Sequence, residues 1–530
     1  MPDLWRVLVT CDLGREALER FSARPGFSVD VHDVRREDEL VRAIPGYQAV
    51  IVRSNVEVTA RAIAAGSDLL VVGRAGVGVD NIDVEAATRV GVAVVNAPGG
   101  NIVTTGEHAV AMLLSLARRI PQATASVRAG RWEKKKFMGR ELRGKTLGII
   151  GVGRVGSVVA EIAQCFRLRV LAADPYLSQE KASRLGVELC SLDALLAQAD
   201  FLTVHTPLTP ETRGLLGREA FSKMKPGVLV VNCARGGIVD EEALEEALES
   251  GRVGGAALDV FESEPPPPKA LYQRPDVILT PHLGASTVEA QAGVAVEVAE
   301  NVIAYLTTGA APNSVNAPAA AGEALRRLEP YLDLAERLGR FLGQLVPGPV
   351  ASSQVSVLGE AADQGPELVT ASFLKGLLSP ALSVRVNLVN AAAVARERGV
   401  RVATTTSLET QDFSDLISVR VEGPWGRHVL EGTLFGKREP RLVRFDEYRL
   451  DALPEGNLIL IYNDDVPGVI GDIGTCLGAH HVNIAGMYNG RAREGGRAIT
   501  LVNVDSPPTP EVLDALAALP HIQSVKQIIL

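Results

Sequence analysis

The sequence is poor in cysteine, has no excess of positive charge and contains no long apolar run. Its five cysteines are odd in number and scattered, without a C-x-x-C pair, which excludes a disulfide framework and a zinc site. We therefore expect no bound metal and expect reduced thiols in a cytoplasmic protein. The formal net charge of −9 argues against a general nucleic-acid-binding protein, which needs a basic surface. These cysteines are Cys11, Cys165, Cys190, Cys233 and Cys476.

The chain also has no run of about 18 apolar residues, so we expect no transmembrane helix and no membrane partner. The segment MPDLWRVLVTCDLG lacks a cleavage-like site, and we expect no signal peptide. A length of 530 residues is too great for a single core and indicates several domains.

Two series of short apolar runs alternate with helical stretches. The first series covers residues 6–10, 49–54, 69–76 and 92–98, and a long helix opened by Thr104 and Thr105 is predicted near 104–119. The second series covers residues 145–153, 169–175, 200–207, 227–237 and 276–286. Such runs are typical of buried parallel strands joined by β-α-β crossovers. The sequence therefore predicts an α/β protein with two Rossmann-like, doubly wound units in tandem.

The remaining segments complete the predicted domain plan. Helix 288–307 has no strand of its own, so we expect it to return to the first unit. Residues 319–452 mix helical and strand-like stretches, among them RLVRFDEYRL, whereas 457–530 follow the ferredoxin-like order of strand, helix, strand, strand, helix, strand. We predict a discontinuous domain of 1–98 and 289–313, an inserted α/β domain of 99–288, an α+β intervening domain of 314–454 and a ferredoxin-like domain of 455–530.

A glycine-rich loop opens the second α/β unit. Gly151, Gly153 and Gly156 follow the apolar strand TLGII and precede a helix, so the backbone can approach a pyrophosphate at the helix N-terminus. Asp174 ends the next strand, where its carboxylate can accept hydrogen bonds from both ribose hydroxyls and would repel a 2′-phosphate. The pattern predicts NAD as cofactor rather than NADP. A tight strand–helix turn without a ligand is the alternative.

Three polar residues follow later strands of the same unit: Arg235 in NCARGGIVD, Glu264 in LDVFESEPP and His282 in TPHLGAS. Ligands of doubly wound folds bind at the carboxyl ends of the strands, so these side chains are expected near a nicotinamide and its substrate. A histidine can take a hydroxyl proton near neutral pH, a carboxylate can orient its ring, and an arginine can hold a substrate carboxylate. Singly, each could instead be a structural residue; together they predict oxidation of a 2-hydroxy acid.

Several motifs make the resemblance to a family plain. VNCARGGIVDEEAL, GAALDVFESEPP and PHLGAST resemble signatures of the D-isomer-specific 2-hydroxyacid dehydrogenases. VGRAGVGVDNIDVEAA and NAPGGNIVTTGEHAVAMLL resemble the branch of that family that oxidises D-3-phosphoglycerate with NAD, the first step of phosphorylated L-serine biosynthesis. The resemblance implies that His282 is the acid/base, Glu264 its partner and Arg235 the substrate-orienting cation. It also implies cofactor contacts from Val77, Gly151, Gly153, Arg154, Val155, Gly156, Asp174, Thr206, Cys233, Ala234, Asp259, Gly284 and Ala285.

The substrate of that branch carries a phosphate and a carboxylate. Arg53 and Arg74 end strands of the first unit, and two guanidinium groups suit a phosphate. The loop at Gly76 and Val77 offers backbone N–H groups to the carboxylate, although the family often has threonine where this chain has Val77. We predict Arg53, Ser54, Arg74, Gly76 and Asn101 as substrate-binding residues.

Two further features concern assembly and regulation. The basic segment RWEKKKFMG (131–139) is either a solvated charge run or, as the resemblance implies, part of a dimer interface anchored by Trp132. Residues 457–530 resemble an ACT domain, in which Asp465 and Asn483 could contact serine, unless the module only mediates association. Residues 319–452 resemble the intervening domain of the longer enzymes of this family. We expect a homodimer or, from two different two-fold contacts, a homotetramer.

Two other functions remain open on the sequence alone. A glyoxylate or hydroxypyruvate reductase of the same family would need no phosphate pocket, which disfavours it. A non-catalytic, NAD-sensing corepressor on the same fold is disfavoured by the complete set of Arg235, Glu264 and His282.

Overall fold

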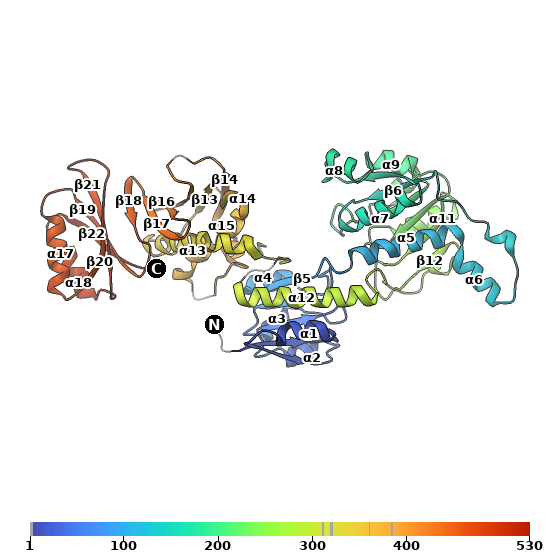
Figure 1. Cartoon of the computed structure of the whole chain (residues 1–530), viewed down its shortest axis with the longest axis horizontal. Coiled ribbons are helices and arrows are strands. Elements are labelled where there is room, and N and C mark those ends of the chain that lie inside the picture. The colour runs from blue at the N-terminus through green and yellow to red at the C-terminus, as the bar shows by residue number, and fades with distance from the viewer. Residues whose placement is uncertain (1–3, 310–311, 319–321, 360, 383–384, 411) are drawn as a thin grey trace. The chain divides into compact units, whose positions relative to one another are not determined.

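The computed structural model describes residues 4–309, 312–318, 322–359, 361–382, 385–410 and 412–530 (Figure 1). The chain divides into two compact units, residues 1–97 with 298–530 and residues 98–297. No helix in the described ranges is long and apolar enough to cross a membrane.

The first unit begins with a parallel five-stranded sheet of order β2-β1-β3-β4-β5. The sequence missed strand β2, because its side chains are only partly buried and give no apolar run. Helix α12 (Val288–Thr308) packs against this sheet from Val298 onward, since a Cβ on Gly73 of β4 would contact Val298 and Val302. The elements are β1 (Trp5–Val9), α1 (Arg15–Ser22), β2 (Phe27–Val31), α2 (Glu37–Ala43), β3 (Ala49–Val52), α3 (Ala60–Ala65), β4 (Val71–Arg74), α4 (Val84–Val90) and β5 (Ala93–Asn96).

The second unit contains a parallel seven-stranded sheet of order β12-β11-β10-β9-β6-β7-β8. One buried cluster joins the sheet to helices α5 and α7, and a second lies on the side of α9, α10 and α11, so both faces are covered. The doubly wound plan predicted from the apolar runs is confirmed. The strands are β6 (Thr146–Ile150), β7 (Arg169–Ala173), β8 (Glu188–Leu189), β9 (Phe201–Val204), β10 (Val228–Asn232), β11 (Val253–Leu258) and β12 (Val277–Leu279).

Three short helices of this unit start at a side-chain cap. The side chains of Ser178, Ser191 and Asp240 each accept a hydrogen bond from a backbone N–H in the first turn of α8, α9 and α11. The helices are α5 (Ile102–Arg118), α6 (Ile120–Arg128), α7 (Arg154–Cys165), α8 (Gln179–Arg184), α9 (Leu192–Gln198), α10 (Arg218–Lys223) and α11 (Glu241–Glu249), with 3-10 turns η1 (Lys134–Phe137) and η2 (Ala270–Gln273).

The prediction that Thr104 and Thr105 open the long helix was wrong. Helix α5 begins at Ile102, two residues before Thr104, and neither threonine caps it. Instead, the Thr104 hydroxyl lies 3.3 Å from that of Thr287, and the Thr105 hydroxyl donates to the carbonyl of Gly284 at 3.0 Å. The two threonines therefore hold the segment that follows β12, which carries His282.

The first unit continues with a six-stranded mixed sheet of order β14-β13-β15-β16-β17-β18. Helices α13 and α15 pack on it, with Leu338, Phe341 and Phe373 in a common core. The stretch RLVRFDEYRL is not one strand but a hairpin, because the chain turns at Asp446, whose φ is 49°. The elements are α13 (Gly322–Leu345), β13 (Ser352–Gly359), α14 (Ala361–Gln364), α15 (Pro366–Leu378), η3 (Ser379–Ala381), α16 (Ala391–Glu397), β14 (Arg401–Ser407), β15 (Asp415–Gly423), β16 (Gly426–Phe435), β17 (Glu439–Phe445) and β18 (Tyr448–Ala452).

The last segment forms an antiparallel four-stranded sheet of order β20-β21-β19-β22, the ferredoxin-like plan predicted from its element order. Helices α17 and α18 lie on one side of this sheet, drawn in red in Figure 1, and share a core with Ile459, Ile461 and Val502. The elements are β19 (Asn457–Asp464), α17 (Val469–Ala479), β20 (Ile484–Arg491), β21 (Arg497–Val504), α18 (Pro510–Ala517) and β22 (Ile522–Ile529).

Candidate active site

The glycine loop lies where the strand order of the seven-stranded sheet reverses, between β6 and β9. Gly151 has φ 85°, and a Cβ there would lie 2.7 Å from the carbonyl oxygen of His205. A Cβ on Gly156 would overlap the carbonyl oxygen of Gly151. A Cβ on Gly153, by contrast, would meet nothing within 4 Å. Two of the glycines thus allow close packing, and the third leaves open space at the N-terminus of α7.

Asp174 directly follows β7 and is tied to this loop. One carboxylate oxygen accepts a hydrogen bond from the backbone N–H of Val152 at 2.8 Å, and the other accepts from that of Tyr176 at 2.8 Å. Each oxygen keeps a second lone pair, which a ribose hydroxyl can use. The carboxylate would repel the 2′-phosphate of NADP, so the geometry fits NAD. Arg154 is exposed and Val155 half-buried in the first turn of α7.

Thr206 lies on the opposite side of the loop, after β9. Its hydroxyl oxygen is buried and has no hydrogen-bond partner among the described residues. Its Cγ2 would lie 2.7 Å from a Cβ on Gly151. An orphaned hydroxyl beside a glycine loop is what a dinucleotide phosphate or ribose would satisfy. Burial lowers the pKa of the neighbouring His205 to about 4, so its ring is neutral at pH 7.

His282 and Glu264 meet at the carboxyl ends of β12 and β11. Nδ1 of His282 lies 2.7 Å from Oε2 of Glu264, and both side chains are half-exposed. Oε1 of Glu264 accepts from the backbone N–H of Phe261 at 3.2 Å, which fixes the carboxylate. Because a carboxylate requires a donor, Nδ1 carries the proton, and Nε2 is the nitrogen that can exchange a proton with a ligand.

Arg235 lies in the turn after β10. The Asn232 side chain stabilises this turn with two hydrogen bonds. Its amide nitrogen donates to the Arg235 carbonyl at 2.9 Å, and its amide oxygen accepts from the Ala234 N–H at 3.0 Å. The guanidinium donates to the carbonyl of Ala234 at 2.7 Å. A Cβ on Gly236 would overlap the carbonyl of Phe261, so this turn packs against the segment that leads to Glu264.

Three of the predicted cofactor residues are buried in the same unit: Cys233, Asp259 and Gly284. Burial and the charge of Asp259 raise the pKa of the Cys233 thiol far above its usual range, so the thiol is neutral. The Asp259 side chain is fully buried and accepts from the N–H of Gly284 at 2.8 Å. Ala285, next along the chain, is half-buried, and its carbonyl accepts from the amide of Gln291 at 3.4 Å.

Glu241, at the start of α11, is a supporting residue that the sequence did not single out. Its buried carboxylate accepts from the backbone N–H of Glu262 at 3.0 Å, from Lys269 at 2.5 Å and from the Tyr272 hydroxyl at 2.6 Å. Burial would raise the pKa of Glu241, but the hydrogen bonds from Lys269, Tyr272 and Glu262 outweigh it and hold the pKa below its usual value. The loop that carries Glu264 is thereby fixed to α11.

In the first unit, Arg53 and Arg74 lie at the carboxyl ends of β3 and β4. Both influence Cys11, after β1: burial raises the pKa of this thiol, while the charge and hydrogen bond of Arg53 and the charge of Arg74 oppose that change. The guanidinium of Arg74 donates to the carbonyl of Ala75 at 2.5 Å. The two arginines that are predicted to bind phosphate thus both lie near Cys11. The sequence did not single out this cysteine.

The other predicted substrate residues lie at loops. Gly76 has φ 154°, a backbone conformation that residues with a Cβ rarely adopt, and it lies against the guanidinium of Arg74. The carbonyl of Val77 accepts from the Asn96 amide at 2.6 Å, and Ser54 is exposed in a turn after β3. Asn101 precedes helix α5 and does not cap it with its side chain.

The predicted effector residues of the C-terminal module have separate partners. The Asp465 carboxylate accepts from Arg491 at 3.3 Å and from the N–H of Gly495 at 3.1 Å. Asn483, just before β20, is exposed, and its amide donates to Asp505 at 2.7 Å. The structure gives no contact between Asp465 and Asn483.

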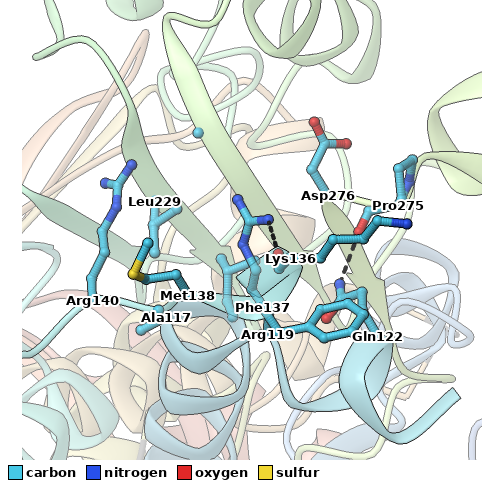
Figure 2. Close-up of a pocket in the computed structure, with 13 residues that line it drawn as sticks. Ala117, Arg119, Gln122, Lys136, Phe137, Met138, Arg140, Leu229, Pro275 and Asp276 are labelled. Atoms are coloured by element: carbon cyan, nitrogen blue, oxygen red, sulfur yellow. Dashed lines mark hydrogen bonds between the residues drawn. The ribbon is translucent and has the colours of Figure 1, made fainter. Parts of the chain in front are cut away.

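The basic segment 131–139 borders a cavity of about 360 Å³ in the second unit (Figure 2). Leu229 and Asp276 line it from the amino ends of the strands, so this cavity lies opposite the sheet edge that carries Arg235, Glu264 and His282. Figure 2 shows the hydrogen bond of 3.3 Å from Arg119 to the Lys136 carbonyl. Trp132 and Met138 are 85% and 80% exposed.

Comparison with known proteins gives three matching families. Residues 110–284 match the family described as D-isomer specific 2-hydroxyacid dehydrogenase, NAD binding domain. Residues 327–446 match the D-3-phosphoglycerate dehydrogenase intervening domain, and residues 457–521 match the ACT domain.

Curated relatives and solved structures agree with these families. The chain is 45% identical to D-3-phosphoglycerate dehydrogenase of Archaeoglobus fulgidus over 98% of both chains, and 41% identical to that of Bacillus subtilis over 99% of both. The structure is similar to a glyoxylate reductase from Paecilomyes thermophila, with 30% identity, a TM-score of 0.55 and coverage of 59% of this chain and 99% of that one. D-lactate dehydrogenase from Aquifex aeolicus, solved with NAD and lactic acid, is 26% identical, with a TM-score of 0.52 over 59% of this chain and 100% of that one.

Proposed function

This chain belongs to the D-3-phosphoglycerate dehydrogenases, a branch of the D-isomer-specific 2-hydroxyacid dehydrogenases, and on that premise we propose how its residues act. It oxidises D-3-phosphoglycerate to 3-phosphooxypyruvate and reduces NAD, the first step of phosphorylated L-serine biosynthesis. The observation that carries the mechanism is the His282–Glu264 pair, with 2.7 Å between Nδ1 and Oε2.

When bound, NAD supplies the acceptor for the hydride that leaves C2 of the substrate. Asp174 and the loop at Gly151, Gly153 and Gly156 bind the dinucleotide, and Thr206 offers it a buried hydroxyl. As the C2–H bond breaks, Nε2 of His282 takes the proton of the C2 hydroxyl, which becomes the carbonyl of the product.

Four further residues complete the proposed site. Glu264 stabilises the imidazolium that forms on His282 and holds its ring. Arg235 binds the substrate carboxylate through a fork of two hydrogen bonds. Arg53 and Arg74 bind the phosphate; both lie at the carboxyl ends of neighbouring strands and both act on the Cys11 thiol.

Steady-state kinetics with D-3-phosphoglycerate, D-glycerate and D-lactate tests this assignment. We expect the phosphorylated acid to have the highest kcat/KM, because only it can use Arg53 and Arg74. In Arg53→Gln, kcat/KM for D-3-phosphoglycerate should fall about 10-fold or more, while that for D-glycerate changes less. Equal losses for the two acids would contradict a phosphate-binding role, and no turnover of the phosphorylated acid would refute the function.

Glyoxylate reduction and NAD sensing without catalysis are not favoured. The full-length likeness is to D-3-phosphoglycerate dehydrogenases, whereas the likeness to a glyoxylate reductase covers 59% of this chain. A sensor has no need of a proton-transferring pair such as His282 and Glu264.

We further propose that serine inhibits the enzyme at the ACT domain through Asp465 and Asn483. The exposed Asn483 amide and the Asp465 carboxylate offer a donor and an acceptor to an amino acid. Asn483→Ala should lose serine inhibition and keep kcat, whereas Asp514→Asn on the exposed face of α18 should behave as the wild type. Inhibition that is equal in all three proteins would exclude this site.

The proposed assembly is a cytoplasmic homotetramer built from two kinds of two-fold contact. The support is the exposure of Trp132 and Met138 on the basic segment, together with the ACT module. The five thiols are all free, as a reducing compartment keeps them. Sedimentation of Trp132→Ala should show smaller particles than the wild type, and a monomeric wild type would refute the assembly.

A further inference from the structure

The catalytic histidine is held in an uncommon backbone conformation. His282 has φ 54°, in the left-handed region that residues other than glycine rarely adopt. A residue keeps such a conformation only when the surrounding structure fixes it. The position of His282 therefore depends on the groups that hold residues 280–284.

One buried residue, Asp259, supplies most of those groups. The main-chain oxygen of Asp259 accepts from the N–H of His282 at 2.9 Å. Its Oδ1 accepts from the N–H of Leu283 at 2.7 Å and from the Thr280 hydroxyl at 2.6 Å, while Oδ2 accepts from the N–H of Gly284 at 2.8 Å. Asp259 thus binds four of the five residues from 280 to 284 and sets the turn on which His282 lies.

His108 of helix α5 is the side chain that meets this carboxylate from the other side. Its Nε2 lies 3.2 Å from Oδ1 of Asp259 and 3.2 Å from the hydroxyl oxygen of Thr280. Because the Thr280 hydroxyl donates its proton to Asp259, it can only accept from Nε2. The Asp259 carboxylate is an acceptor as well, so Nε2 of His108 must carry a proton. Burial would raise the pKa of Asp259, but hydrogen bonds from His108, Thr280 and Leu283 outweigh it and keep the group ionised.

The same cluster contains the thiol of Cys233, and the ligand atoms of His108, Cys233 and Asp259 all lie within 4.8 Å of one another. These are residue types that bind zinc. However, both oxygens of Asp259 already accept hydrogen bonds from backbone N–H groups, and Nε2 of His108 already contacts Thr280 and Asp259. The cluster is therefore satisfied as a hydrogen-bond network, without a cation.

We propose that His108 is a positioning residue for the dehydrogenase reaction, acting on His282 through Asp259 and Thr280. It lies in NIVTTGEHAVAMLL, in which Asn101 is the predicted substrate-binding residue. The donated hydrogen bond of Nε2 keeps the Asp259 carboxylate oriented toward the N–H groups of Leu283 and Gly284. The His282 ring then keeps its geometry toward Glu264 and the C2 hydroxyl. This inference rests on the proposed function of His282.

The test compares His108→Leu, which removes the donor, with His108→Gln, whose amide can restore it. In His108→Leu, kcat should fall about 10- to 100-fold and KM for D-3-phosphoglycerate should change less than about 3-fold. The isotope effect on kcat with substrate deuterated at C2 should rise, because chemistry becomes slower. His108→Gln should recover most of kcat. The matched control is His428→Leu, which removes another histidine paired with a carboxylate, 2.8 Å from Asp446, and should match the wild type.

Unchanged kcat and isotope effect in His108→Leu, or no recovery in His108→Gln, would overturn the positioning role. Zinc retained stoichiometrically by the wild type and lost from His108→Leu would overturn it as well. A crystal structure of His108→Leu tests the inference without any measurement of turnover. We expect His282 to lose its positive φ in this variant. An unchanged loop would refute the inference, even if the wild type oxidised no substrate. If His108→Leu does not fold, Thr280→Val removes the bridging hydroxyl and gives the same test.

Discussion

Replacing Glu264 with glutamine removes a charge from the pair it forms with His282 while keeping the size of the side chain. A short charge-assisted hydrogen bond contributes about 1.5–3 kcal/mol when it is shielded from water. Here the histidine and glutamate side chains are 48% and 37% exposed, which lowers the contribution to about 1–2 kcal/mol. Since about 1.4 kcal/mol corresponds to a tenfold change in rate, kcat should fall about 5- to 30-fold.

Stopped-flow and steady-state measurements on Glu264→Gln and on Glu262→Gln separate this effect from general loss of charge in the loop. Glu262 is similarly exposed, at 44%, but pairs with Lys269 at 3.1 Å and does not contact His282. We expect wild-type kcat in Glu262→Gln, an unchanged affinity for NADH in both variants, and a stability change below about 1 kcal/mol. A wild-type kcat in Glu264→Gln, or an equal loss in both variants, would refute the reasoning.

Four further substitutions test the cofactor loop and the buried contacts of Glu241. Gly156→Ala should lower the free energy of unfolding by about 1–3 kcal/mol, because its Cβ overlaps a carbonyl, whereas Gly153→Ala should unfold as the wild type and only bind NADH more weakly. Asp174→Ser should raise the ratio of kcat/KM for NADP over NAD about 10-fold, since the carboxylate no longer repels the 2′-phosphate; an unchanged ratio would contradict this role. Glu241→Gln should destabilise the protein by about 1–3 kcal/mol at pH 7, measured by urea unfolding against Glu242→Gln. Because the pKa of Glu241 is lowered in the folded state, this difference is present above pH 4.5, its ordinary pKa, and should shrink as the pH falls below that value; a difference that persists in acid would exclude the ionic explanation.

The sequence was sufficient for the parts of the fold that depend on local pattern. Buried parallel strands appear as apolar runs, so the strands that lead to the glycine loop, Arg235 and His282 could be predicted. Strand β2 is partly exposed and β8 has two residues, so neither gives such a run. The hairpin at Asp446 was missed because its turn residues do not interrupt the strand pattern strongly.

The supporting contacts of the site could not be predicted, because they join residues far apart in the chain. His108 and Thr280 are separated by 172 residues, and Glu241 and Lys269 by 28. A single sequence shows that each residue is polar, but not that folding brings it to the loop that carries Glu264 or His282. Thr104 and Thr105 show the same limit: they have the residue type of a helix cap, yet they bind the segment after β12.

The most direct measurement is the stoichiometry of products from D-3-phosphoglycerate and NAD. The wild type should form NADH and 3-phosphooxypyruvate in equal amounts, identified by absorbance and by mass spectrometry of the trapped keto acid. His282→Ala should form neither at a comparable rate while it binds NADH with nearly unchanged affinity. NADH formation without the phosphorylated keto acid, or full activity of His282→Ala, would contradict the account.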